Sequence, residues 1–306
     1  MCAVRVPLLA VFALLALCSP AGAEGLQARW LSVDGVRVRY FDTGVPGDAA
    51  AERTILFVHG YCGSAANFAQ LCASLAAAEG CPCGPSRCVA VDLPGCAGSD
   101  KPDVPYSTAW FVDFLQSFRR ALGLEDLVLV GHSMGGQICL HYTQRFPHAV
   151  EKLILIAPDG LAGEEGGWLA LTTLGPLVDA GLMRANRSFV EIALRTVILS
   201  DPSFATPALV DCFAEGLLTP EGARATAAIT RDVIGHDPVD AILPGIFQKT
   251  LVIWGAEDRL LRPSWAPRFV QLLPAAELAL VDGCGHEPMI EKPAETAALI
   301  AAFLAR

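Results

Sequence analysis

The sequence predicts an α/β protein with a doubly wound, mainly parallel sheet and an inserted helical cap. Two observations support this fold class. Along most of the chain, short aliphatic runs typical of strands buried on both faces alternate with longer runs of helical periodicity. The alternation stops between residues 160 and 243, a stretch too long for a loop inside a compact domain. Strand–helix alternation of this kind normally gives parallel strands joined by right-handed crossovers.

The predicted elements follow one another in a regular order. Alternating apolar residues over Val33–Tyr40 predict an early antiparallel hairpin. Buried strands are expected at Thr54–Val58, Val89–Val91, Leu127–Val130, Lys152–Ala157, Thr250–Trp254 and Leu278–Val281. Helices are expected at Ala65–Ala78, Thr108–Leu122, Gln137–Arg145 and Ala294–Ala305.

The interruption of this order divides the chain. Residues 160–243 contain short helical runs broken by Pro202, Pro207, Pro220 and Pro238. We therefore assign residues 24–159 and 244–306 to a core that contains the sheet, and residues 160–243 to the cap. Apolar side chains of the cap could line a pocket or only hold the cap together, since most buried apolar residues serve packing. They are Trp168, Leu169, Leu171, Leu174, Phe189 and Ile198.

The composition excludes some partners. The net charge is −10, and no run of Lys or Arg provides a surface for nucleic acid. No internal stretch reaches the roughly 18 uninterrupted apolar residues of a membrane-spanning helix. The sequence predicts no cofactor and no metal site, and it gives no indication of the oligomeric state.

The first residues, 1–23, have the features of a signal peptide. Arg5 supplies the positive start, Pro7–Leu17 an apolar core, and Ala21-Gly22-Ala23 a small-residue cleavage site. We therefore expect a secreted or periplasmic protein with no stable membrane span after cleavage. Lipid anchoring at Cys18 is less favoured, because Leu17 is large for the position before a lipidated cysteine.

The cysteines agree with export. Of the 11 cysteines, Cys2 and Cys18 lie in the leader, which leaves nine. Exported proteins commonly oxidise such pairs, so the segment Cys81–Cys88 is expected to hold at least one disulfide, with Cys72 as a further partner. Free thiols in a core rich in small residues are the alternative, and the Cys81–Cys88 spacing does not fit a zinc site.

A motif that carries chemistry follows the strand Leu127–Val130. Gly131-His132-Ser133-Met134-Gly135 matches G-x-S-x-G, and a helical run comes after it. A Ser between a strand and a helix turns through a strained backbone at the carboxyl edge of the sheet, where open α/β sheets bind ligands. A loop that only joins strand to helix is the alternative, but the flanking elements favour a nucleophile at Ser133.

Further stretches stand in a fixed order around this motif. They are His59–Ser64, Asp92–Pro102, Gly131–Gly135, and the pair formed by Asp258 and Gly285-His286. Together they resemble the α/β-hydrolase superfamily, and more narrowly its capped lipase- and esterase-like members. The resemblance implies the α/β-hydrolase fold with the cap over the carboxyl edge, and an oxyanion hole formed by the backbone N–H groups of Tyr61 and Met134. It also implies that His59 braces its loop.

The base and the acid complete the expected site. Among six histidines, only His286 follows a late strand in a glycine-rich loop, in the chain order Ser, Asp, His typical of this fold. His132 is expected to point away from the nucleophile. The acid stays open between Asp258, which fits the family pattern and which we favour, and Asp159, in a Pro-Asp-Gly turn. Glu257 is a weaker third choice.

These residues predict an enzyme that cleaves carboxylic esters through a Ser133–His286–Asp258 triad and an acyl-enzyme. An apolar cap suits a small hydrophobic ester, but the acyl chain and the alcohol cannot be inferred from the sequence. Two alternatives remain: a C–C bond hydrolase of ring-cleavage products, and a non-catalytic binding module on the same fold.

Overall fold

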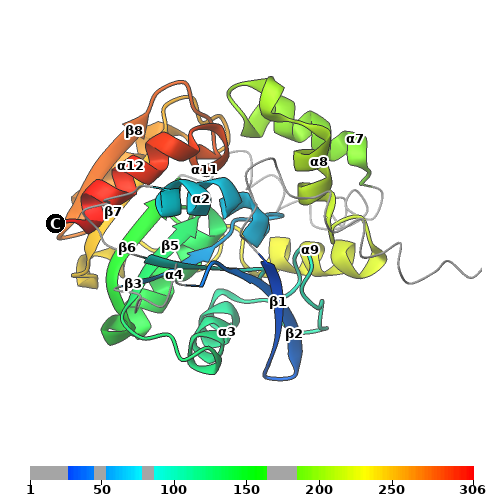
Figure 1. Cartoon of the computed structure of the whole chain (residues 1–306), viewed down its shortest axis with the longest axis horizontal. Coiled ribbons are helices and arrows are strands. Elements are labelled where there is room, and N and C mark those ends of the chain that lie inside the picture. The colour runs from blue at the N-terminus through cyan, green and yellow to red at the C-terminus, as the bar shows by residue number, and fades with distance from the viewer. Residues whose placement is uncertain (1–26, 45–52, 78–85, 164–184) are drawn as a thin grey trace, which may run out of the picture.

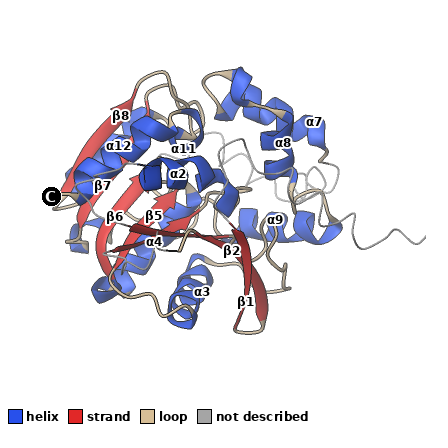
Figure 2. Cartoon of the chain, in the orientation of Figure 1, coloured by secondary structure: helices blue, strands red, loops and turns tan. Residues whose placement is uncertain are grey.

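The computed structural model describes residues 27–44, 53–77, 86–163 and 185–306. An eight-stranded sheet runs through it in the order β1-β2-β4-β3-β5-β6-β7-β8 (Figures 1 and 2). The strands are β1 (Gln27–Val33), β2 (Val36–Asp42), β3 (Arg53–Val58), β4 (Ser86–Val91), β5 (Leu127–His132), β6 (Val150–Ile156), β7 (Lys249–Gly255) and β8 (Ala276–Val281).

The strand directions confirm the predicted fold class. From β4 through β8 all neighbouring pairs are parallel, whereas β1 and β2 form an antiparallel hairpin whose second strand pairs with β4. Asp34 and Gly35 form the hairpin turn with φ values of 49° and 82°. Both central residues of such a two-residue turn need positive φ, which Asp and Gly tolerate.

Helices cover both faces of the sheet, as Figure 2 shows. On one face, α2 packs against α12; on the other, α3 packs against α4. The described α-helices outside the predicted cap are α2 (Ala69–Ala77), α3 (Thr108–Ala121), α4 (Met134–Arg145), α10 (Ala266–Leu272), α11 (Pro288–Glu291) and α12 (Pro293–Leu304).

The strand β5 shows why the apolar run folds this way. Leu127 and Leu129 belong to one apolar cluster, and Val128 and Val130 to the other. Alternate side chains of a strand point to opposite faces, so a strand covered on both sides must be apolar throughout. All six residues of β5 are buried.

The described part of the predicted cap, residues 185–243, contains helical segments and no strand. They are α7 (Arg187–Ala193), the π-helical turn η3 (Leu194–Ile198), the 3₁₀ turn η4 (Pro202–Phe204), α8 (Pro207–Ala214) and α9 (Pro220–Asp232), followed by the 3₁₀ turn η5 (Leu243–Gly245). Three of the four prolines expected to break helices stand at the first position of one, where the missing N–H has no cost. Trp168, Leu169, Leu171 and Leu174 lie outside the described residues, as does the N-terminal leader.

An ion-pair cluster joins the cap to the core. The Arg39 guanidinium on β2 donates two hydrogen bonds of 2.7 Å to the carboxylate of Glu215, which follows α8. Arg39 also pairs with Asp92, whose carboxylate accepts the backbone N–H of Ala65 at 2.7 Å. The Asp92 loop therefore has a structural role: it holds an arginine that is itself bonded to the cap.

The described cysteines are free thiols. They include Cys72 and Cys88, both buried against the same face of the sheet. Cys81 and Cys83 lie outside the described residues, so a disulfide at the Cys81–Cys88 segment stays a prediction.

Candidate active site

Ser133 stands between β5 and α4 in a strained conformation. Its φ of 52° and ψ of −123° are sparsely populated by residues other than glycine. The flanking glycines make the turn possible: a Cβ on Gly131 would lie 2.6 Å from the carbonyl oxygen of Gly135, and one on Gly135 would lie 2.4 Å from that of Val58. This is the strand–turn–helix geometry that presents a nucleophile.

His286 reaches the same site from the loop after β8. Its Nδ1 lies 2.8 Å from Oδ2 of Asp258, and both side chains are buried. The other carboxylate oxygen of Asp258 accepts the backbone N–H groups of Leu260 at 2.8 Å and Leu261 at 2.9 Å. The carboxylate is thus fixed on both sides, and it holds the imidazole through Nδ1.

The two alternative acids hold other positions. Asp159 Oδ1 accepts the backbone N–H of Gly160 at 2.8 Å, which is the turn chemistry that Pro-Asp-Gly predicts. Glu257 accepts the N–H of Cys284 at 2.8 Å and shapes the loop that precedes His286. The contact to the imidazole therefore favours Asp258 over Asp159 and Glu257 as the acid that pairs with His286.

Charges around His286 suit a base. Burial disfavours the charged imidazolium, but the charge of Asp258 and its hydrogen bond outweigh burial and raise the pKa of His286 above its usual value. Burial and the neighbouring His286 hold the pKa of His132 well below its usual range.

His132 and His59 are structural in this arrangement. The His132 ring packs 4.7 Å from that of His286, and its Nε2 lies 2.9 Å from the His286 carbonyl oxygen. This differs from our expectation that His132 points away from the site, because it lines the same cavity as Ser133. His59 braces its loop as the resemblance implies: its Nε2 accepts the N–H of Leu93 at 3.0 Å.

The expected oxyanion donors lie beside Ser133. Met134 is the first residue of α4, so its N–H has no partner within the helix. Tyr61 lines the cavity with Ser133, and its hydroxyl lies 2.7 Å from that of Thr230 on α9. The loop that carries the Tyr61 N–H is therefore held from the cap side.

A cavity of about 250 Å³ lies over the site between core and cap. Its described lining combines Ser133 and His286 with mostly apolar cap residues. The lining residues are Tyr61, Cys62, His132, Ser133, Phe189, Val190, Ala193, Leu194, Val197, Ile198, Phe213, Leu217, Leu260, His286 and Glu287. Phe189 and Ile198 were expected from the sequence as possible lining residues. Glu287 was not singled out.

The cap also contacts the backbone of His286 directly. The backbone N–H of His286 donates to the carbonyl oxygen of Ile198 at 2.8 Å. Nearby, the Glu291 carboxylate accepts the N–H of Ser200 at 2.8 Å and that of Gly285 at 2.8 Å. The histidine loop is therefore anchored to η3 and the residues that follow it.

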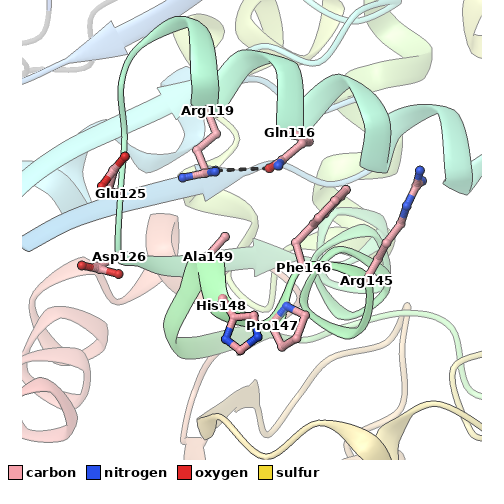
Figure 3. A pocket seen from close by; sticks show the side chains of 9 residues that line it. All are labelled: Gln116, Arg119, Glu125, Asp126, Arg145, Phe146, Pro147, His148 and Ala149. Carbon is pink, nitrogen blue, oxygen red and sulfur yellow. Dashed lines mark hydrogen bonds between the residues drawn. The ribbon is translucent and has the colours of Figure 1, made fainter.

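A second cavity, of about 360 Å³, lies at the opposite edge of the sheet, where β5 and β6 begin (Figure 3). It is lined by Gln116, Arg119, Glu125, Asp126, Arg145, Phe146, Pro147, His148 and Ala149. No Ser, Thr or Cys nucleophile stands among these described lining residues, so the chemistry is expected at the Ser133 cavity.

Within the described residues, no cluster of three or more His, Cys, Asp or Glu side chains could hold a metal ion. No helix in the same part of the chain is long and apolar enough to cross a bilayer.

A comparison with protein families identifies the fold. A family described as the alpha/beta hydrolase fold matches residues 53–293, which include the Ser133 turn, Asp258 and His286. The chain belongs to the alpha/beta hydrolase family. This confirms the resemblance inferred from the sequence motifs.

Curated relatives within the alpha/beta hydrolase family are distant. Lipase 1 of Psychrobacter immobilis is 27% identical over 268 residues, covering 84% of this chain and 78% of the lipase. A 1-acylglycerol-3-phosphate O-acyltransferase of Arabidopsis thaliana is 30% identical over 149 residues, covering 47% of this chain. That match spans only 34% of the plant protein's length.

Solved alpha/beta hydrolase structures resemble the chain over most of its length. A membrane phospholipase A, a bacterial virulence factor, superposes with a TM-score of 0.77 at 25% identity, covering 97% of this chain and 90% of that one. A meta-cleavage product hydrolase from Pseudomonas fluorescens has a TM-score of 0.70 at 21% identity, covering 90% of this chain and 96% of that one. The second likeness concerns the fold alone.

Proposed function

We propose that this protein is a serine hydrolase that cleaves carboxylic esters. The observation that carries the proposal is the Asp258–His286 pair, whose histidine lines one largely apolar cavity together with Ser133. A serine hydroxyl is a weak nucleophile at neutral pH, and a fixed histidine–carboxylate pair is what activates it.

The reaction proceeds in two halves. His286 Nε2 takes the proton of Ser133 as the oxygen attacks the ester carbonyl, and then gives that proton to the leaving alcohol. Asp258 remains ionised, holds the imidazole in the correct tautomer and stabilises the imidazolium. Water then hydrolyses the acyl-enzyme with His286 acting again as base.

The negative charge that develops on the ester carbonyl oxygen during the attack must be stabilised by hydrogen-bond donors. The N–H groups of Tyr61 and Met134 take this role in the proposal, supported by their positions beside Ser133. Each oxyanion-hole donor typically contributes about 3–4 kcal/mol to the barrier reduction. Apolar side chains such as Phe189, Val197 and Leu217 favour a small hydrophobic acyl or alkyl group.

The cavity argues against C–C bond hydrolysis. A ring-cleavage dienoate carries a carboxylate, and no Lys or Arg lines the cavity within the described residues. A non-catalytic binding module would have no use for a strained Ser133 beside a paired base, since such strain persists mainly where it serves function.

The test combines labelling with a substrate panel. Wild-type protein should react with an active-site fluorophosphonate and hydrolyse p-nitrophenyl esters of graded chain length. Ser133→Ala should lose both properties, with turnover lower by several orders of magnitude and the fold retained. Retained turnover in that variant, or cleavage of a ring-cleavage dienoate in preference to every ester, would contradict the proposal.

Export is part of the same proposal. It rests on the leader at residues 1–23 and the cysteine content of the remaining chain. The mass of the protein recovered from culture medium or periplasm would test cleavage after Ala23.

A further inference from the structure

Glu287 is a buried acid in the wall of the active-site cavity. It follows His286 directly, is 3% exposed and lines the cavity that holds Ser133. Its Oε2 has no hydrogen-bond partner among the described residues. Buried polar atoms are nearly always paired, so an unpaired one at a functional site calls for a partner that binds there.

The neighbouring acids show the contrast. Asp258 accepts hydrogen bonds from His286 and from two backbone N–H groups. Glu291 accepts from the N–H of Gly285 and from the N–H and hydroxyl of Ser200. The hydrogen bonds of both carboxylates hold the loop that carries His286. Glu287 Oε2 makes no comparable hydrogen bond within the part of the chain that the structure describes.

The surroundings define the chemical form of Glu287. Burial raises the pKa of its carboxyl to about 8; His286 opposes the shift, while Glu291 and Asp258 add to it. The group is therefore an uncharged acid at neutral pH, with one O–H donor and free acceptor capacity. To pair with an ammonium group, Glu287 would have to ionise, which would place a third carboxylate charge beside Asp258 and Glu291. A neutral polar partner therefore fits better.

The position also selects the part of the substrate that meets this acid. In the proposed reaction His286 gives its proton to the leaving alcohol, so the alcohol portion lies on the His286 side of the cavity. Glu287 lines the cavity next to this residue, whereas most other described lining residues are apolar. A hydroxyl group placed there would have the Glu287 carboxyl as a polar partner in a mostly apolar cavity.

We propose that Glu287 is a specificity residue that hydrogen-bonds a hydroxyl group on the alcohol portion of the ester. The preferred substrates are then esters of hydroxyl-bearing alcohols rather than plain alkyl esters. This inference rests on the proposed ester hydrolysis and assigns the class of alcohol that the site selects. A site built to bond a substrate hydroxyl discriminates against the analogue that lacks it, because the buried group is then left unpaired.

The test compares two esters with one acyl group, n-propyl butanoate and 3-hydroxypropyl butanoate, with p-nitrophenyl butanoate measured in parallel. For wild type, kcat/KM should favour the hydroxypropyl ester by about tenfold, the size of one net hydrogen bond. Glu287→Met should bring the ratio close to one. Glu287→Gln keeps a neutral donor and acceptor, so it should retain most of the preference. Glu221→Gln, an exposed cap substitution, is the matched control and should keep the wild-type ratio.

The outcomes separate the two proposals. Cleavage of p-nitrophenyl butanoate with a propyl-to-hydroxypropyl ratio near one in wild type would overturn the role of Glu287 alone. An unchanged preference in Glu287→Met would do the same. Failure of wild type to cleave any ester would overturn the proposed function and this inference together. Loss of an unpaired buried acid should not lower the melting temperature, which checks that each variant is folded.

Discussion

Asp258→Asn is expected to lower kcat/KM for ester hydrolysis by about 10⁴ while leaving the fold intact. In the structure, Oδ1 of Asp258 accepts the N–H groups of Leu260 and Leu261, and Oδ2 lies against Nδ1 of His286. An asparagine must keep its carbonyl oxygen on the two backbone donors, because its NH₂ group cannot accept them.

The consequence for the histidine follows from this constraint. The amide NH₂ then faces Nδ1 of His286, which must give up its proton and act as acceptor. The proton moves to Nε2, and that nitrogen can no longer take the proton of Ser133. A loss of 10⁴ corresponds to about 5.5 kcal/mol of transition-state stabilisation, far more than one neutral hydrogen bond contributes.

The assay is kcat/KM for a p-nitrophenyl ester together with the melting temperature of each variant. Asp159→Asn is the matched control, because Asp159 Oδ1 binds the backbone of Gly160, and it should change kcat/KM only a few-fold. If Asp258→Asn kept more than a tenth of the activity, or if Asp159→Asn lost it, the assignment of the acid would be wrong.

Two further predictions concern titration and thiols. The raised pKa of His286 places the acid limb of kcat/KM above the usual histidine value of about 6.5, since the base is lost as pH falls through that pKa. A pH–rate profile with its acid limb below about 6.5 would contradict the contribution of Asp258 to the pKa of His286. Export predicts at least one disulfide near Cys81–Cys88, so the unfolded, unreduced mature protein should show fewer than nine reactive thiols, and a titration that finds all nine would refute it.

Much of the fold and the reacting groups could be predicted because their signals are local. The run Leu127–Val130 is apolar because helices cover β5 on both faces of the sheet. A run of this kind can be recognised from the sequence alone. The Ser133 turn needs glycines within two residues on either side, so its geometry leaves a short motif. His286 was identified by its place after a late strand.

The remaining features depend on contacts between distant segments. Asp258 and Asp159 both follow strands that end at the same edge, so the sequence favoured Asp258 only by its fit to the family pattern, and the 2.8 Å contact to His286 is visible only in the structure. Glu287 was missed because the cavity that it lines is formed together with cap residues from far along the chain. The task of Asp92 depends in the same way on Arg39 and Glu215, which no motif connects.

The bond between His286 N–H and the carbonyl oxygen of Ile198 bears on how new specificities could be engineered or evolve in this scaffold. Most apolar walls of the cavity come from the cap, so exchanging whole caps between homologues would be the most direct way to remodel it. Such a chimera would also replace a backbone anchor of His286, the proposed general base. Exchanging the cap therefore changes the shape of the cavity and the turnover together. Stepwise side-chain changes at positions such as Phe189 or Val197 leave the hydrogen bond to His286 in place.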